Sequence, residues 1–162
     1  MCDDDHTAPP VIGSSLVRAY AEVGASVVFT GRQCVLVDGV NVGPASRIAV
    51  AFHESTNDYL RLLCDDSWES FAAVCSPTFE KALETAERWY SGIGEHWVRT
   101  GFSPAEDRQH LEEYFDGGKC SFCSALPNTS KSMFQGHNAW ICNKCVVELK
   151  GLLDESGDII IE

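Results

Sequence analysis

An α+β fold is predicted by the order of the expected elements and by the spacing of the cysteines. Segments with strand character occur together between residues 27 and 74, and two helical segments follow them. The chain therefore lacks the strand–helix alternation of a wound parallel sheet. Two Cys-x-x-Cys pairs then lie near the C-terminal end. We expect an antiparallel sheet with two or three helices, followed by a small cysteine-rich module.

Changes in composition divide the chain of 162 residues, of which 44% are hydrophobic, into four parts. That share of hydrophobic residues is ordinary for a packed core. Residues 1–13 are predicted to be an acidic flexible leader, and residues 14–116 to form the α+β domain. Residues 117–155 form the cysteine-rich module, and residues 156–162 form a short apolar tail.

The first structured segment is predicted to be a short helix over residues 14–22. A serine can cap its N-terminus, and Leu16, Val17 and Tyr20 fall on one face at helical spacing. Gly24 is expected to end this helix, because glycine is the residue that most often follows a helix C-terminus.

The strands are predicted from runs of β-branched and aromatic residues and from alternation of apolar with polar positions. Asp38-Gly39 is the clearest turn, because Asp-Gly supplies the positive φ angles that a two-residue hairpin turn needs. The expected strands are Val27–Thr30, Cys34–Val37 paired with Val40–Val42, Arg47–His53, Tyr59–Cys64 and Trp68–Val74.

Two helices are predicted to follow the strands. The first covers residues 77–91, where apolar residues repeat at helical spacing from Phe79 to Tyr90 and Gly92 stops the helix. The second runs from Ser103 to about Phe115. It opens with Ser-Pro-Ala-Glu, a capping box with proline at the first helical position.

Cys120, Cys123, Cys142 and Cys145 carry the strongest chemical signal in the sequence. Two Cys-x-x-Cys pairs separated by eighteen residues are typical of a tetrahedral zinc site, because each tight turn aims two thiolates at one point. Four thiolates complete the coordination shell, so the one Zn²⁺ ion expected per chain is structural rather than catalytic. The alternative is two disulfides or free thiols.

The surroundings of these cysteines resemble the zinc-binding domain at the N-terminus of ClpX, the unfoldase of the Clp protease. The matching motifs are Cys120–Cys123, Met133–Gly136, Ala139–Val146 and the helical run that ends with Leu152-Leu153. Ser124 departs from the family, which usually has glycine there, and Leu126-Pro127 changes the following loop. The resemblance implies a treble-clef-like C4 zinc module that dimerises and holds adaptors and substrates. The phosphate loop of an ATPase, Gly-x-x-x-x-Gly-Lys-Ser/Thr, does not occur in the sequence.

The net charge of −12 is distributed unevenly along the chain. Residues 1–118 hold 8 basic and 19 acidic side chains, whereas residues 119–162 hold 4 and 5. Neither part offers the basic face that nucleic acid requires, so we expect no nucleic-acid partner and instead a basic protein partner. No apolar run is long enough to cross a membrane, and the acidic N-terminus is unlike a signal peptide. A cytoplasmic location is therefore predicted.

Catalytic residues are not predicted anywhere in the chain. Cys34, Cys64 and Cys75 lie in apolar strands or at their ends, where a cysteine acts as a small hydrophobic residue. Asp65-Asp66 fits a turn, and His53 fits a surface position at the end of a strand. The histidines, including His137 in the cysteine loop, show no metal-binding spacing. Trp97 is either packed under the helices or an anchor for a partner.

Two classes of function follow. The favoured class is a non-enzymatic protein-binding protein with a structural zinc module, acting as an adaptor or regulator; an acidic immunity protein that neutralises a basic toxin is an alternative of the same class. The other class is an enzyme with an unrecognised site in residues 14–115. A homodimer through the zinc module is also predicted, because so small a unit cannot bury all its apolar residues. The candidate contacts are Phe122, Met133, Phe134, Trp140, Val146 and Leu149.

Overall fold

The computed structural model describes residues 7–116, 118–136 and 139–156, and the chain divides into two compact units, Met1–His110 and Leu111–Glu162. The strands of the first unit are β1 (Val11–Ile12), β2 (Ser15–Glu22), β3 (Val28–Phe29), β4 (Leu36–Val37), β5 (Val40–Asn41), β6 (Arg47–His53), β7 (Asp58–Cys64), β8 (Ser70–Ser76), β9 (Tyr90–Ser91) and β10 (Val98–Arg99). Its helices are α1 (Phe79–Trp89) and the 3-10 turn η1 (Ile93–Glu95). Helix α2 (Pro104–Tyr114) begins in this unit and ends in the second.

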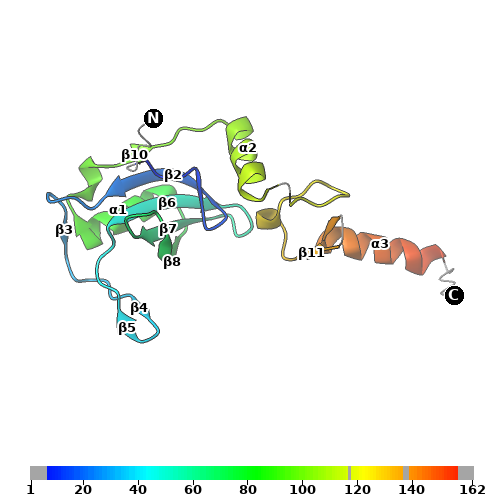
Figure 1. Cartoon of the computed structure of the whole chain (residues 1–162), viewed down its shortest axis with the longest axis horizontal. Helices are drawn as coiled ribbons and strands as arrows, with labels where there is room; N and C mark the ends of the chain where they lie inside the picture. The colour runs from blue at the N-terminus through cyan, green and yellow to red at the C-terminus, as the bar shows by residue number, and fades with distance from the viewer. Residues whose placement is uncertain (1–6, 117, 137–138, 157–162) are drawn as a thin grey trace. The chain divides into compact units, whose positions relative to one another are not determined.

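An antiparallel sheet forms the centre of the first unit, with the strand order β1-β2-β6-β7-β8 (Figure 1). β1 and β10 both pair with β2, on the edge that β6 leaves open. β6 and β7 pair over seven consecutive residues without a register shift, with Ile48 opposite Leu63 and Phe52 opposite Tyr59. The short hairpin of β4 and β5 projects from this sheet with the expected Asp38-Gly39 turn, and both turn residues have positive φ.

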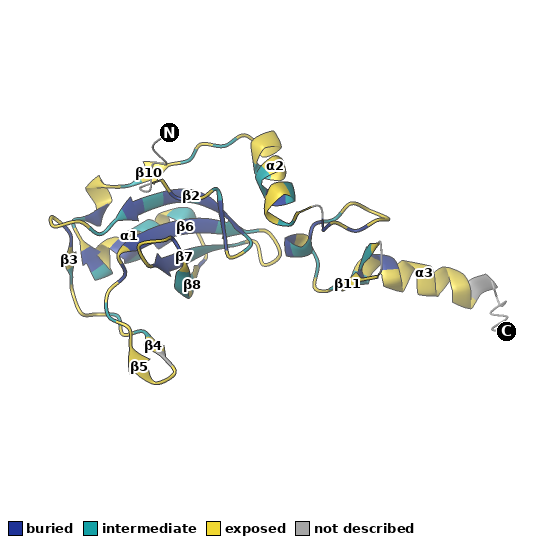
Figure 2. Cartoon of the chain, in the orientation of Figure 1, coloured by how far each residue is buried: buried dark blue, intermediate teal, exposed yellow. Residues whose placement is uncertain are grey.

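An apolar cluster packs on each face of the sheet. On one face, Ala86 of α1 packs with Ile48 of β6 and Leu63 of β7. On the other face, Trp68 and the segment that contains Ala8 and Ile12 cover Val17, Ala49 and Leu62. Figure 2 shows the result as a band of buried residues along β2, β6 and β7. The α+β class is confirmed, but the expected grouping of all strands before the helices is wrong, because the short strands β9 and β10 follow α1.

The helix predicted for residues 14–22 is wrong, because this segment forms strand β2. Ser15, Leu16 and Val17 are buried in succession, so this end of the strand lacks the alternation that distinguishes a half-exposed strand. A β-bulge between Val17 and Ala19 shifts the register and disturbs the period further. The structure also differs from the predicted flexible leader over residues 1–13, because Val11–Ile12 pair with β2 as strand β1.

Helices α1 and α2 form within the predicted ranges, except that Tyr90–Ser91, expected to end the first helix, form strand β9. Thr78 caps α1, since its Oγ1 accepts a hydrogen bond from the Lys81 N–H at 3.1 Å. In the capping box of α2, the Glu106 carboxylate accepts hydrogen bonds from the N–H and hydroxyl of Ser103 at 2.8 and 2.7 Å. These contacts satisfy backbone donors that a helix N-terminus leaves free.

The second unit contains η2 (Pro127–Thr129), β11 (Met133–Gln135), β12 (Trp140–Cys142) and α3 (Asn143–Ser156). β11 and β12 form an antiparallel hairpin, and α3 follows β12 directly. Within the described residues, no helix has the length and apolar character needed to cross a membrane. Residues 1–6 of the predicted leader, Gly117, His137, Asn138 and residues 157–162 of the predicted tail lie outside the described residues.

Candidate metal centre

The Sγ atoms of Cys120, Cys123, Cys142 and Cys145 all lie within 4.8 Å of one another. Cys120 Sγ is 3.8 Å from Cys145 Sγ, and Cys123 Sγ is 3.6 Å from Cys142 Sγ. Four ligands at the Zn–S distance of about 2.3 Å stand about 3.8 Å apart in a regular tetrahedron. The cluster therefore has the size of a Cys₄ zinc site, and the cysteines are free of disulfides.

A tight turn aims the first two cysteines at the centre. Within it, the Cys120 N–H donates to the Ala125 carbonyl at 2.8 Å, and the Ser124 N–H donates to the Cys120 carbonyl at 2.8 Å. Ser124 completes the turn with a φ of 59°, in the left-handed region that glycine adopts most easily. This conformation explains why the resembling family usually has glycine at this position.

The second two cysteines are placed by the junction between a strand and a helix. Cys142 ends β12, Asn143 begins α3, and Cys145 therefore lies in the first helical turn. The Cys142 N–H donates to Cys120 Sγ at 3.4 Å, and the Cys145 N–H donates to Cys142 Sγ at 3.5 Å. Such N–H donors stabilise thiolate charge and orient the ligands around a metal.

Ser121 ties the first turn to β12 and thereby brings the two cysteine pairs together. Its N–H donates to the Trp140 carbonyl at 2.8 Å, and its Oγ accepts from the Trp140 N–H at 3.1 Å. The hairpin register places Met133 opposite Cys142, and Met133 packs on the cysteine cluster. The turn, hairpin and helix give the treble-clef-like arrangement that the sequence predicts.

The electrostatics of the cluster favour a bound cation. Burial opposes ionisation of Cys120, but the N–H groups of Cys123, Cys142 and Phe122 outweigh it and lower the thiol pKa to about 6. A hydrogen bond from the Cys145 N–H lowers the Cys142 pKa. The Cys145 pKa is raised mainly by its contact with Cys123 Sγ and, to a smaller extent, by burial. Four sulfurs this close can all be thiolates only when a cation compensates their charge, and Zn²⁺ would supply that charge and fix the fold.

Of the remaining cysteines predicted to be hydrophobic packing residues, only Cys64 is buried. Burial raises its pKa to about 12, so this thiol is chemically inert at neutral pH. Cys34 and Cys75 are exposed instead. Asp65 acts as a turn residue, as expected, because its Oδ1 accepts from the N–H groups of Ser67 and Glu69 at 2.8 and 2.9 Å.

His53 makes contacts that the sequence did not predict. Its Nδ1 lies 2.9 Å from Ser15 Oγ, and its Nε2 lies 2.8 Å from Ser55 Oγ. Ser15 is fully buried, so the serine–histidine contact ties β2 to β6 and leaves the hydroxyl out of reach of a substrate. Trp97 is half-buried and packs on the core beneath α1, which is the packing alternative of the prediction.

Comparison with known protein families agrees with this geometry. Residues 118–155, under a quarter of the 162-residue chain, match the ClpX C4-type zinc finger. Comparisons with curated proteins and with solved structures give no significant match. The matched segment contains all four clustered cysteines, so residues 118–155 are a ClpX-type C4 zinc finger built to hold one structural zinc ion.

Proposed function

We propose that this chain is a non-enzymatic protein-binding protein whose zinc module provides the docking surface. The observation that carries the proposal is the amount of apolar side chain left exposed on the second unit. Phe122 is 64% exposed, Val147 68% and Leu152 63%. Exposed apolar side chains on so small a unit mark an interaction site more often than chance, because each costs solvation free energy when no partner covers it.

Helix α3 presents the most regular part of this surface. Val146, Leu149 and Leu152 recur every third residue, so they lie along one side of the helix, and all three are exposed. Phe122 of the first cysteine turn and Phe134 of β11 add two exposed rings to the same unit. Of the contacts expected from the sequence, Met133 and Trp140 are half-buried and so contribute less.

A second copy of the chain is the first occupant to test, because an isologous dimer uses one apolar patch twice. Sedimentation velocity of the full, zinc-loaded chain at 1–200 μM, a range of about two decades around typical weak dimers, should show a concentration-dependent dimer. Leu149→Asp with Leu152→Asp should give a monomer that retains one zinc ion. Leu36→Asp, at a similarly exposed position in the β4–β5 hairpin, is the matched control and should dimerise normally. A wild-type monomer throughout the range would contradict the dimer.

The acidity of residues 1–118 supports a basic protein as the further partner. With 8 basic and 19 acidic side chains, this part attracts basic surfaces and repels acidic ones. Such a partner would suit either an adaptor or an immunity role. Affinity purification from the native host at low and at 0.5 M salt tests the charge argument, since exposed charges are screened within a few ångströms at the higher salt. Retention of the same partner at both salt concentrations would contradict an electrostatic contact.

A further inference from the structure

A concave site in the first unit is separate from the zinc module and makes no use of the proposed docking surface. It has a volume of about 340 Å³, the lower end of the range typical of small-ligand pockets. Residues from β2, β7, α1, β10 and the segment after β10 line it. The side chains that give it its chemistry are Arg18, Tyr59, Phe79, Glu80, Arg99 and Phe102.

Aromatic rings form the apolar wall of this pocket. Tyr59 and Phe79 have their ring centroids 5.7 Å apart, and Phe52 continues the row with its centroid 5.2 Å from that of Tyr59. Phe102 is the third ring that lines the pocket, and it packs on His110 at 4.6 Å. Because each ring is held by a neighbour, the wall is formed before any ligand arrives.

Arg99 places a positive charge at this wall. Its guanidinium carbon lies 4.8 Å from the centroid of the Phe79 ring. Stacking uses the face of the guanidinium and leaves its N–H edge available for a planar anion. Among the described residues, no carboxylate forms an ion pair with Arg99, whose side chain is exposed.

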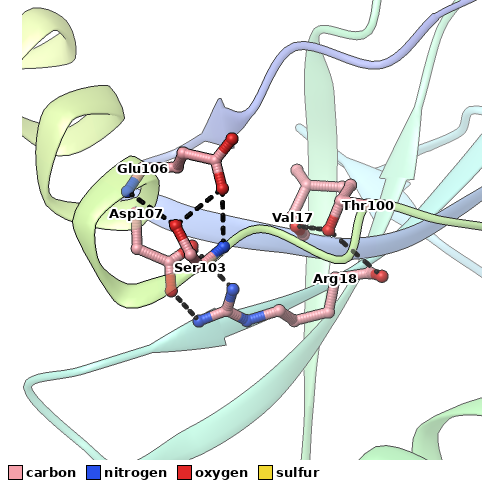
Figure 3. Close-up of polar contacts among 6 residues, drawn as sticks. All are labelled: Val17, Arg18, Thr100, Ser103, Glu106 and Asp107. Carbon is pink, nitrogen blue, oxygen red and sulfur yellow. Dashed lines mark hydrogen bonds and ion pairs between the residues drawn. The ribbon is translucent and has the colours of Figure 1, made fainter.

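The second guanidinium of the pocket is already compensated. Arg18 donates two hydrogen bonds to the Asp107 carboxylate, at 2.7 and 2.8 Å (Figure 3). Thr100 holds the segment after β10 against β2, because its Oγ1 donates to the Val17 carbonyl at 2.8 Å. The pocket therefore has a fixed frame with one uncompensated cation, Arg99, and one carboxylate on its lining, Glu80.

We propose that this pocket binds a carboxylate carried on an aromatic group. Arg99 pairs with the carboxylate through its N–H edge, and the rings of Tyr59, Phe79 and Phe102 pack against the aromatic part. A free aromatic acid and the C-terminal residue of a peptide both present this chemistry. On a chain with a net charge of −12, an acidic ligand needs such a local cation to bind at all.

Phenylacetate is the probe that tests this pocket, added to the full, zinc-loaded, ¹⁵N-labelled chain. Saturable shifts are expected at the Arg99 side-chain Nε–H and at the Thr100 and Gly101 amides. Phenylacetamide, which keeps the ring without the charge, and acetate, which keeps the charge without the ring, should each bind at least about tenfold more weakly. Equal binding of phenylacetamide would overturn the role of the charge, and equal binding of acetate that of the rings.

Two substitutions with opposite expected signs make the test specific. Arg99→Gln should weaken phenylacetate binding about tenfold or more, because it removes the charge-assisted contact. Glu80→Gln should tighten binding a few-fold, because it removes the carboxylate that competes with the ligand. Arg32→Gln, at an exposed arginine outside the pocket, is the matched control and should change nothing. The proposal would be overturned if Arg99→Gln, with native amide dispersion, bound phenylacetate as tightly as the wild type. It would also be overturned if the wild type showed no saturation up to 10 mM phenylacetate, which means a binding free energy weaker than about 3 kcal/mol.

A pair of short peptides separates the two sources of the carboxylate. One ends in phenylalanine with a free carboxylate, and the other is its C-terminal amide. Tighter binding of the free-acid peptide than of phenylacetate assigns the pocket to a peptide terminus. Tighter binding of phenylacetate assigns it to a small aromatic acid. Either result supports the pocket independently of dimerisation, because no zinc-module residue lines it.

Discussion

Arg61 is a charged side chain buried in the first unit. It lies on the interior strand β7 and is 1% exposed, and among the described residues its Nε and one Nη atom have no hydrogen-bond partner. Its guanidinium carbon lies 3.9 Å from the ring centroid of Trp89 in α1, so a cation–π contact replaces an ion pair. Burial, only partly offset by Tyr90, lowers the Arg61 pKa to about 10, which means that the fold disfavours the charged form.

Replacing Arg61 with methionine should therefore leave the unfolding free energy unchanged or raise it by about 1–3 kcal/mol. Methionine fills a similar volume and removes a buried charge whose desolvation no carboxylate of the described residues offsets by an ion pair. Urea unfolding of the first unit, followed by circular dichroism, gives the change. Arg32→Met, at an exposed position, serves as the control and should shift the midpoint little. A loss of more than about 2 kcal/mol in Arg61→Met would show that the guanidinium contributes more than the ring contact.

At the level of elements, prediction succeeded where local sequence decides the structure. β6 forms over Arg47–His53 as expected, and Thr78 and Ser103 begin α1 and α2 because caps act within four residues. The prediction for the segment of β2 failed because tertiary burial on both faces, rather than local preference, makes Ser15–Glu22 a strand. The short strand β10 escaped prediction for a related reason, since its two residues pair only with the distant β2.

The ion pair of Arg18 with Asp107 anchors α2 to β2 and should stabilise the first unit measurably. The side chains are 26% and 16% exposed, and the contact is bidentate, so solvent screens it less than an ordinary surface pair. A double-mutant cycle with Arg18→Gln and Asp107→Asn should give a coupling of about 1–2 kcal/mol. The exposed pair of Lys81 with Glu84, 49% and 57% exposed, should couple more weakly, because water screens it. Equal couplings for the two pairs would contradict the anchoring role.

Considered as a whole, the molecule contains two kinds of site that differ in how far the sequence reveals them. The clustering of the four cysteines was predicted from the sequence, because each Cys-x-x-Cys pair is local and its spacing alone places two thiols on one turn. No sequence motif indicated the pocket around Arg99, because Arg18, Tyr59 and Phe79 become neighbours only when the sheet and α1 assemble. Local motifs are visible in a single sequence, whereas a pocket built from distant strands depends on the register of the sheet.

The two units also have separate sources of stability, and this leads to the last prediction. The first unit has an apolar core on each face of its sheet, whereas the cluster described around the metal site of the second is formed by Cys120, Cys142 and Cys145 with a few half-buried neighbours. Structural zinc typically contributes about 10–16 kcal/mol of apparent binding free energy that is coupled to folding. Cys142→Ser should therefore lower the zinc content from one ion per chain to none and unfold residues 118–155.

Metal analysis and amide spectra of the full chain measure both parts of this expectation. The signals of β6 and β7 should keep their positions, because the first unit does not depend on the metal, and a chelator added to the wild type should reproduce the same spectrum. Cys75→Ser, at an exposed cysteine of β8, is the matched control and should keep one zinc ion. Full zinc occupancy in Cys142→Ser would contradict the ligand assignment, and loss of the β6 and β7 signals would contradict the independence of the two units.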